Sequence, residues 1–391
     1  GIPSAVRLVY MEDGKGEVRK DMPYIFDVGD HCIYSVNVKM PEKAGLVWYY
    51  FELETERGMV YYGNNSKQLG GIGEMCFNSP SNSYQITVYN EDYKTPDWFK
   101  TGIAYQIFVD RFCNGNENGE FLGNRTDIIK RNWGEQPFYK AEQFGGEYKA
   151  NDFFGGNLKG VIKKLPYLKD LGISVIYLNP IFKAYSNHKY DTGDYETIDP
   201  MFGDEETFKE LCSKAKEMGI RIILDGVFNH TGSNSRYFNK YGEYDSVGAY
   251  QSKESPYYTW FRFMDWPDVY ESWWGMTTLP QIEEHSEECR KYLLSDKDAI
   301  VKRWIKNGAS GWRLDVVDEL PGFFVKELRE NVKKADKDAV IIGEVWEDAS
   351  NKSAYGERRE YFLGKELDSV MNYPMRRALI CLLYTSDAAD D

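Results

Sequence analysis

The sequence predicts an α/β protein whose main domain is an incomplete (β/α)8 TIM barrel of about six strands, preceded by an all-β sandwich domain. Repeated strand-then-helix units run through residues 99–378, and their strands are continuously apolar, as in a buried parallel sheet. Polar and acidic residues follow one strand after another, which favours a barrel over a doubly wound sheet. A closed barrel has eight strands, and we find six at most.

The first 98 residues predict a β-sandwich, because short strand candidates alternate with turns that contain Gly, Asp and Asn. Residues 90–99, which contain Pro96, are expected to form a linker. The strand candidates before this linker are residues 6–10, 34–38, 46–51 and 84–89.

The barrel elements follow in order, with strands judged by short apolar runs and helices by apolar residues at helical spacing. Gly219 is expected to end the second helix. Residues 231–284 show no clear periodicity and are expected to form a long insertion after the third strand. The predicted strands are 103–109, 173–178, 220–224, 311–315, 340–344 and 367–371, and the predicted helices are 158–171, 204–218, 287–307 and 323–334.

The composition argues against several classes of function. The 391-residue chain has a net charge of −14, which disfavours nucleic acid and anionic membranes as partners. Its apolar runs are too short to span a bilayer, and no secretory signal is visible, so we expect a cytoplasmic protein. The six cysteines and four histidines lack zinc-binding spacing, and we expect no required cofactor. The aromatic content of 16% is high, and such rings either stack on sugars or fill cores.

Two predicted strands each end in a carboxylate. The strand 311–315 ends at Asp315, and the strand 340–344 ends at Glu344. The helical segment 323–334 lies between them, so the strands are expected to be parallel neighbours about 4.8 Å apart. Two carboxylates at matching strand ends would then face each other at roughly 5 Å, the separation in a retaining glycosidase. On spacing alone, two unrelated surface acids explain the pattern equally well.

Further polar residues accompany this pair. Arg313 shares a strand face with Asp315, and an arginine there would hold the carboxylate ionised and oriented, or form a structural ion pair. Asp225 and His230 follow the third strand and would line a sugar pocket, although an ordinary turn also fits.

Two loops carry the remaining candidates. His188 and Tyr190 follow the second strand and could bond to and stack on one sugar ring, with a solvated loop as the alternative. An oxygen-rich group could hold Ca²⁺, with a plain turn as the alternative. This group consists of Asn114, Asn116, Gly155 and Asn157.

Together and in this order, these pieces resemble glycoside hydrolase family 13, the α-amylase family, and within it the neopullulanase, cyclomaltodextrinase and maltogenic amylase group. The first 98 residues resemble that group's N-terminal starch-binding-like module, and residues 231–284 resemble its domain B. Residues 278–283 depart from the motif usual in this group. The blocks that carry the resemblance are residues 105–112, 154–158, 177–182, 187–195, 225–230, 311–315 and 343–346.

The resemblance implies a retaining α-glucan hydrolase with Asp315 as nucleophile and Glu344 as general acid/base. Its substrates would be cyclodextrins, pullulan, maltooligosaccharides or starch, and the protein would form a homodimer. A transglycosylase of the same family and a non-catalytic carbohydrate-binding relative are the alternatives. Trp346 would form a wall of the acceptor side. The residues that the resemblance places around the scissile glucosyl unit are Arg313, Asp225, His230, His188 and Tyr190.

The chain departs from the family at its end. The family has a third catalytic carboxylate at the end of the seventh strand, and neither the seventh nor the eighth strand is found here. Residues 379–391 fit no expected element and read as a non-native tail on a C-terminally truncated chain. An open barrel would leave strand edges and core surface exposed, so we expect this exact chain to be poorly soluble and inactive.

Overall fold

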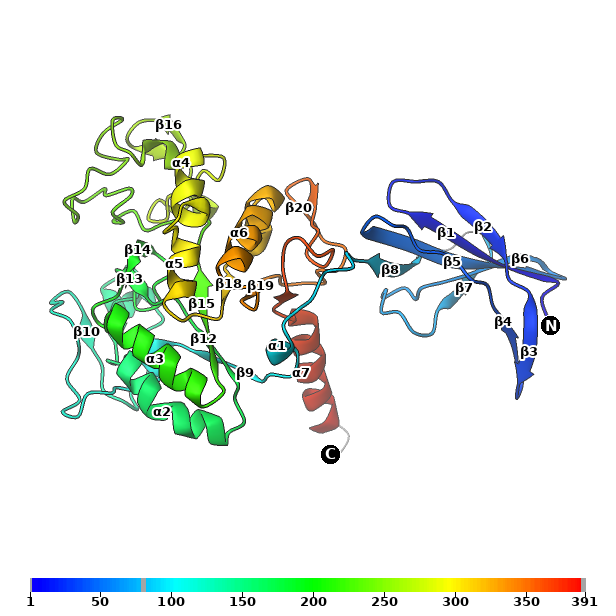
Figure 1. Cartoon of the computed structure of the whole chain (residues 1–391), viewed down its shortest axis with the longest axis horizontal. Coiled ribbons are helices and arrows are strands. Elements are labelled where there is room, and N and C mark those ends of the chain that lie inside the picture. Colours follow the sequence, from blue (N-terminus) through cyan, green and yellow to red (C-terminus); the bar gives the residue numbers. More distant parts are fainter. Residues whose placement is uncertain (1, 79–81, 388–391) are drawn as a thin grey trace. The chain divides into compact units, whose positions relative to one another are not determined.

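The computed structural model describes residues 2–78 and 82–387 (Figure 1). These residues form two compact units. The first comprises the chain up to Tyr93 together with Glu360–Lys365, and the second comprises Lys94–Arg359 and the chain from Glu366 onward. The sequence predicted this boundary between residues 98 and 99.

The first unit is an antiparallel β structure, as expected for this region. The long strand β5 (Gly45–Thr55) is central: β1 pairs along one side, while β8 and then β6 pair along the other. Strands β3 (Tyr24–Val28) and β4 (His31–Tyr34) form a separate hairpin. The other strands of the sheet are β1 (Ala5–Glu12), β2 (Val18–Asp21), β6 (Gly58–Gly63), β7 (Glu74–Cys76) and β8 (Tyr84–Val88).

One predicted strand of this unit is wrong. The alternating pattern at residues 34–38 predicted a strand, but β4 ends at Tyr34 and residues 35–38 belong to no strand. Alternation reports which side chains are half-buried and does not supply a hydrogen-bonded neighbour. The predicted strands at 6–10, 46–51 and 84–89 are confirmed.

The second unit is built on a six-stranded parallel sheet, which confirms the predicted fold class. Its spatial order is β22-β19-β18-β15-β12-β9, so the strands follow one another in chain order without reversal. A doubly wound sheet would reverse its order at a switch point, whereas a barrel does not. The strands are β9 (Ala104–Ile107), β12 (Val175–Leu178), β15 (Arg221–Gly226), β18 (Gly311–Leu314), β19 (Val340–Gly343) and β22 (Ser369–Val370).

The helices between the parallel strands bury one face each. Helices α2 (Leu158–Asp170) and α3 (Glu205–Glu217) lie side by side, as do α5 (Ile300–Lys306) and α6 (Gly322–Ala335) (Figure 1). The side chains of Asn157 and Asp204 cap the first two by accepting the backbone N–H groups of Gly160 and Thr207. Two further helices are the short α1 (Asp97–Lys100) in the expected linker and α7 (Tyr373–Asp387).

The single helix predicted over residues 287–307 is wrong. The chain forms α4 (Glu287–Arg290) and a π-helical turn (Lys291–Ser295), and Asp296 is then extended before α5 begins. The interruption falls in the polar run 295–298, where serine and aspartate compete for backbone hydrogen bonds and disfavour helix. The buried Leu293 and Leu294 nevertheless keep this region packed.

The insertion at residues 231–284 follows β15 and contains little regular structure. Its two short strands, β16 (Phe263–Asp265) and β17 (Val269–Tyr270), form a hairpin. Aromatic packing holds the segment: the Tyr237 and Trp260 rings stack with centroids 4.9 Å apart, and both are buried. Much of the high aromatic content therefore fills a core.

Three further short pairings complete the described part of the second unit. Strands β13 (Phe182–Ala184) and β14 (Thr192–Ile198) flank a loop between β12 and α3. The others are β10 (Ile129–Lys130) with β11 (Asp152–Phe153) and β20 (Ser353–Ala354) with β21 (Glu357–Arg358). Within the described chain, no helix is long and apolar enough to cross a membrane. Residues 388–391 of the expected tail lie outside the described part.

Candidate active site

Three carboxylates meet at the carboxyl ends of β15, β18 and β19. Asp225 pairs in register with Arg313, and Leu314 pairs with Gly343, so Asp315 and Glu344 follow adjacent strand ends. The predicted parallel neighbourhood of the two strands is thereby confirmed. Gly343 permits this arrangement because a Cβ on it would lie 2.5 Å from the Leu367 side chain.

Arg313 joins the three carboxylates. Its Nη1 donates to Asp225 Oδ1 at 2.9 Å and to Asp315 Oδ1 at 2.8 Å, while its Nη2 lies 2.8 Å from Glu344 Oε2. The guanidinium is almost fully buried, which makes these charge-assisted contacts strong. One cation therefore orients all three acids, and the group carries excess negative charge.

The backbone N–H of Val316 also binds the Glu344 carboxylate. Val316 has φ +37°, a left-handed conformation that is unfavourable for a β-branched residue. In this conformation its N–H donates to Glu344 Oε2 at 3.0 Å. The Tyr373 hydroxyl contacts the other oxygen, Oε1, at 3.4 Å. Strain of this kind, of order 1–3 kcal/mol, is concentrated at functional sites.

Asp225 is held by hydroxyl groups as well as by Arg313. The Tyr177 hydroxyl donates to Asp225 Oδ2, and the Tyr190 hydroxyl donates to the same oxygen at 3.1 Å. Burial raises the pKa of Asp225, and these donors and Arg313 act in the opposite direction. Burial likewise raises the pKa of the Tyr177 and Tyr190 hydroxyls, so both stay protonated as donors.

The charge state of Asp315 differs from the expectation that Arg313 simply keeps it ionised. Burial raises the pKa of Asp315 to about 7, and the charges of Asp225 and Glu344 act in the same direction. Arg313 lowers this pKa but does not outweigh the other causes. The two other acids that share the arginine place negative charge beside Asp315, and together with burial they offset the effect of the arginine.

The two candidate histidines lie next to Tyr190. Tyr190 N–H donates to His188 Nδ1 at 3.1 Å, and His230 Nε2 lies 3.2 Å from the Tyr190 carbonyl oxygen. Burial lowers the pKa of both rings, that of His230 to about 4. Both are therefore neutral at pH 7. The structure thus brings His188, Tyr190, Asp225 and His230 together with the three strand ends.

Trp346 lies at the rim of this site and is 43% exposed. It lines a pocket of about 310 Å³ that also includes Glu344, Trp274 and Tyr355. The Trp274 ring meets the Trp346 ring edge to face, with centroids 6.0 Å apart. Trp274 Nε1 donates to Glu319 Oε1 at 2.6 Å.

Sequence reasoning missed several groups of this site. Tyr177 lies in the block 177–182 that carries the family resemblance, but the sequence predicted no role for it. Asn179 donates to the Tyr190 hydroxyl at 3.3 Å. Trp274 and Glu319 are far apart in sequence, and only the tertiary structure brings them to Trp346.

Two of the proposed calcium ligands, Asn114 and Asn157, lie together, but their side-chain oxygens are engaged in hydrogen bonds. Asn157 Oδ1 accepts the N–H groups of Gly115 and Gly160, and Asn114 Oδ1 accepts the N–H of Asn116 and an amide hydrogen of Asn157. Calcium prefers six to eight free oxygens, several of them carboxylates. The described residues show no cluster of three acidic, histidine or cysteine side chains that could hold a metal. This donor set does not fit Ca²⁺.

Comparison with known proteins gives the family. The family described as "Alpha amylase, catalytic domain" matches residues 106–385. The amylopullulanase of Thermoanaerobacterium saccharolyticum is 41% identical over 365 residues, covering 86% of this chain and 28% of that protein. The cyclomaltodextrinase of Thermoanaerobacter pseudethanolicus is 40% identical over 296 residues, covering 73% of this chain and 45% of that protein.

A solved structure agrees with these relatives. The type III pullulan hydrolase from Thermococcus kodakarensis matches with a TM-score of 0.62 at 31% identity, covering 95% of this chain and 60% of that chain. This chain thus spans less than half of the two curated relatives named above. The sequence match, the six parallel strands and the acids at their carboxyl ends agree, and the chain belongs to the alpha-amylase family of glycoside hydrolases.

Proposed function

We propose that the protein is a retaining α-glucan hydrolase that cleaves α-1,4 bonds, and α-1,6 bonds in addition, of cyclodextrins, pullulan, maltooligosaccharides or starch. The observation that carries this proposal is the Arg313 guanidinium bonded to Asp225, Asp315 and Glu344 at adjacent strand ends. A binding module would not require three acids on one buried cation. The names of the relatives, amylopullulanase and cyclomaltodextrinase, support the substrate class.

In the first step, Glu344 transfers its proton to the glycosidic oxygen while an oxygen of Asp315 attacks the anomeric carbon. The bond between that carbon and the glycosidic oxygen breaks, and the leaving chain departs as an alcohol. In the second step, Glu344 takes a proton from water, which attacks the same carbon and releases Asp315. Two inversions give overall retention. Arg313 and the Val316 N–H hold both acids in position throughout.

His188, Tyr190 and Asp225 are proposed to bind the glucosyl unit that is attacked. Their side chains lie within one connected set of hydrogen bonds, and both tyrosine and histidine present ring faces on which a sugar can stack. His230 contacts the carbonyl oxygen of Tyr190 through Nε2 and so helps to hold Tyr190 in place.

Transglycosylation is the second candidate, favoured by the pocket beside Glu344. Trp274, Trp346 and Tyr355 line this pocket, so a sugar could bind there and replace water as the acceptor. Hydrolysis and transfer share the first step and differ only in which hydroxyl opens the intermediate. Product analysis separates them.

The test is a comparison of wild type with Glu344→Gln on pullulan, cyclodextrin and maltotriose. We expect a loss of turnover on the order of 10²–10⁴-fold, because general acid catalysis is removed. Glu206→Gln is the matched control, since this exposed carboxylate on α3 pairs with Lys209 of the same helix. Near-wild-type turnover by Glu344→Gln would refute the assignment.

The stereochemistry of the first product is the second readout. Fresh α-anomeric product seen by NMR supports retention, and β-anomeric product would refute the roles given to Asp315 and Glu344. A homodimer and independence from metal ions are further proposals. Sedimentation and activity after chelation test them.

A further inference from the structure

In the loop of residues 186–191, between β13 and β14, successive side chains belong alternately to the protein interior and to the candidate site. His188 and Tyr190 belong to the candidate site, and their rings lie 5.7 Å apart. Asn187 and Lys189, the intervening residues, are buried and bond to the protein interior. Each site residue is therefore flanked by an anchor.

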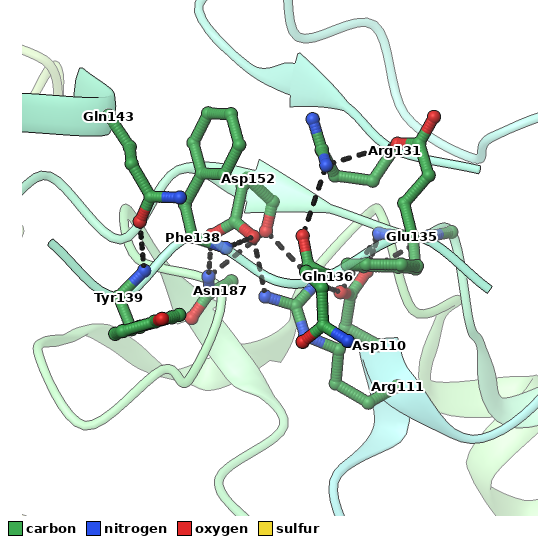
Figure 2. A network of polar contacts seen from close by, with 12 residues as sticks. Asp110, Arg111, Arg131, Glu135, Gln136, Phe138, Tyr139, Gln143, Asp152 and Asn187 are labelled. Atoms are coloured by element: carbon green, nitrogen blue, oxygen red, sulfur yellow. Dashed lines mark hydrogen bonds and ion pairs between the residues drawn. The ribbon is translucent and has the colours of Figure 1, made fainter. Parts of the chain in front are cut away.

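Both anchors bind a buried carboxylate. Asn187 Nδ2 donates to Asp152 Oδ1 at 2.9 Å. Figure 2 shows Asp152 between Asn187, which forms this hydrogen bond, and Arg111, which forms an ion pair with it. The Lys189 ammonium is fully buried and lies 2.7 Å from Asp199 Oδ2. Such buried, paired groups have few alternative positions. The loop backbone is thus tightly placed.

Ser186 and Asp191 close the same loop on itself. Asp191 Oδ2 accepts the Ser186 N–H at 3.1 Å, and Asp191 Oδ1 accepts the Ser186 hydroxyl. The Ser186 oxygen in turn accepts the Lys189 N–H at 2.9 Å. These three contacts fix the turn that carries His188 and sets the direction of the Tyr190 N–H.

The Tyr190 N–H decides which nitrogen of the neutral His188 ring carries the proton. The Tyr190 N–H donates to His188 Nδ1 at 3.1 Å, and a main-chain amide does not give up its proton. Nδ1 must therefore accept, and the neutral ring carries its proton on Nε2. The Ser186 oxygen also lies 3.1 Å from Nδ1, and it faces this nitrogen with a lone pair because its hydroxyl proton goes to Asp191 Oδ1. Such a lone pair would favour a proton on Nδ1, but the Tyr190 amide proton already points at that nitrogen and cannot be moved.

The electrostatic surroundings agree with a neutral ring. Burial lowers the pKa of His188; the charge of Asp191 raises it and the charge of Lys189 lowers it. The neighbouring ring of His230 is itself neutral, because burial lowers its pKa to about 4.

We propose that Ser186 and Asp191 are positioning residues that hold the Tyr190 N–H on His188 Nδ1 and thereby fix His188 as a donor through Nε2–H. Among the described residues, the structure assigns no partner to Nε2. Its acceptor would be a hydroxyl group of the glucosyl unit, so this inference rests on the proposed function. An Nε2 acceptor instead of a donor would require the sugar to supply the proton.

The test is NMR of the chain labelled with ¹⁵N-histidine, with His188 assigned by His188→Gln among only four histidines. At pH 7 we expect a protonated Nε2 and an unprotonated Nδ1 in the wild type. Ser186→Ala and Asp191→Asn should give averaged signals from a mixture of tautomers. Asp348→Asn is the control, because this exposed loop acid also accepts a main-chain N–H, from Ser350, but touches no histidine.

A protonated Nδ1 in the wild type, or wild-type signals in both variants, would overturn the inference. Ser186→Ala removes only a hydroxyl and keeps the test decisive if Asp191→Asn fails to fold. Adding maltotriose then tests the proposed function separately. A fixed Nε2–H without any response to maltotriose would count against the function and not against the tautomer. A response to maltotriose in a chain with a protonated Nδ1 would count against the tautomer and not against the function.

Discussion

Replacing Asp315 by asparagine should abolish turnover and at the same time stabilise the protein in a pH-dependent way. Burial and neighbouring carboxylates raise the pKa of Asp315 from its ordinary value of 3.8 to about 7. A raised pKa means that the folded state binds the proton more tightly than the unfolded state. The resulting stability is present below pH 3.8 and is lost as the pH rises through about 7. Wild type therefore bears a cost at neutral pH that asparagine does not.

The magnitude follows from these two values. One pKa unit corresponds to 1.36 kcal/mol, so the full cost above pH 7 is about 4 kcal/mol, and about 3 kcal/mol of it develops between pH 5 and pH 8. The attraction between Arg313 and the Asp315 carboxylate is already included in this figure, because Arg313 is one of the groups that set the pKa of Asp315. Asp225 and Glu344 still pair with the arginine.

The assay is urea unfolding of wild type and Asp315→Asn at pH 5 and pH 8, followed by tryptophan fluorescence. We expect the advantage of the variant to grow by about 3 kcal/mol from the lower to the higher pH. Asp318→Asn is the control, because Asp318 is less buried and pairs with Lys352 outside the cluster. An advantage that is equal at both pH values would refute the argument that Asp315 has a raised pKa.

Two further predictions concern His230 and Trp346. Burial lowers the pKa of His230 to about 4, so the unfolded state binds the proton more tightly and stability falls as the pH drops from 6.5 toward 4. His230→Gln should flatten the stability difference between pH 7 and pH 5 by about 2 kcal/mol in urea unfolding; an unchanged slope would contradict this. Trp346→Ala should lower the ratio of transfer products to hydrolysis products at high maltotriose concentration, because the ring lines the pocket beside Glu344. An unaltered product ratio would remove this pocket as the acceptor site.

Much of the fold could be read from local sequence. Continuous apolar runs predicted five of the six parallel strands closely, because a strand buried on both faces must be apolar throughout. The sixth, β22 (Ser369–Val370), is shorter than its predicted range of 367–371. The errors fall where local signals conflict with context: residues 34–38 alternate without a strand partner, and the apolar spacing of 287–307 continues through a polar break.

The candidate site was only partly predictable. Asp225, Arg313, Asp315 and Glu344 stand at strand ends, and parallel strands in chain order necessarily bring such ends to one edge. The calcium group illustrates the difficulty, because asparagine oxygens accept local N–H groups just as readily as they bind a metal. The direction of the Asp315 pKa shift was also missed.

The sequence by itself determined the α/β class, the strand order and the carboxylates at the strand ends, because these depend on short-range patterns of polarity. Only the tertiary structure decided how charge is shared there. Asp315 is buried away from water, and one guanidinium pairs with three acids. The spacing of residues along the sequence predicts neither the depth of burial nor the number of charged neighbours. The same holds for His188, whose proton position depends on the direction of a main-chain N–H two residues away.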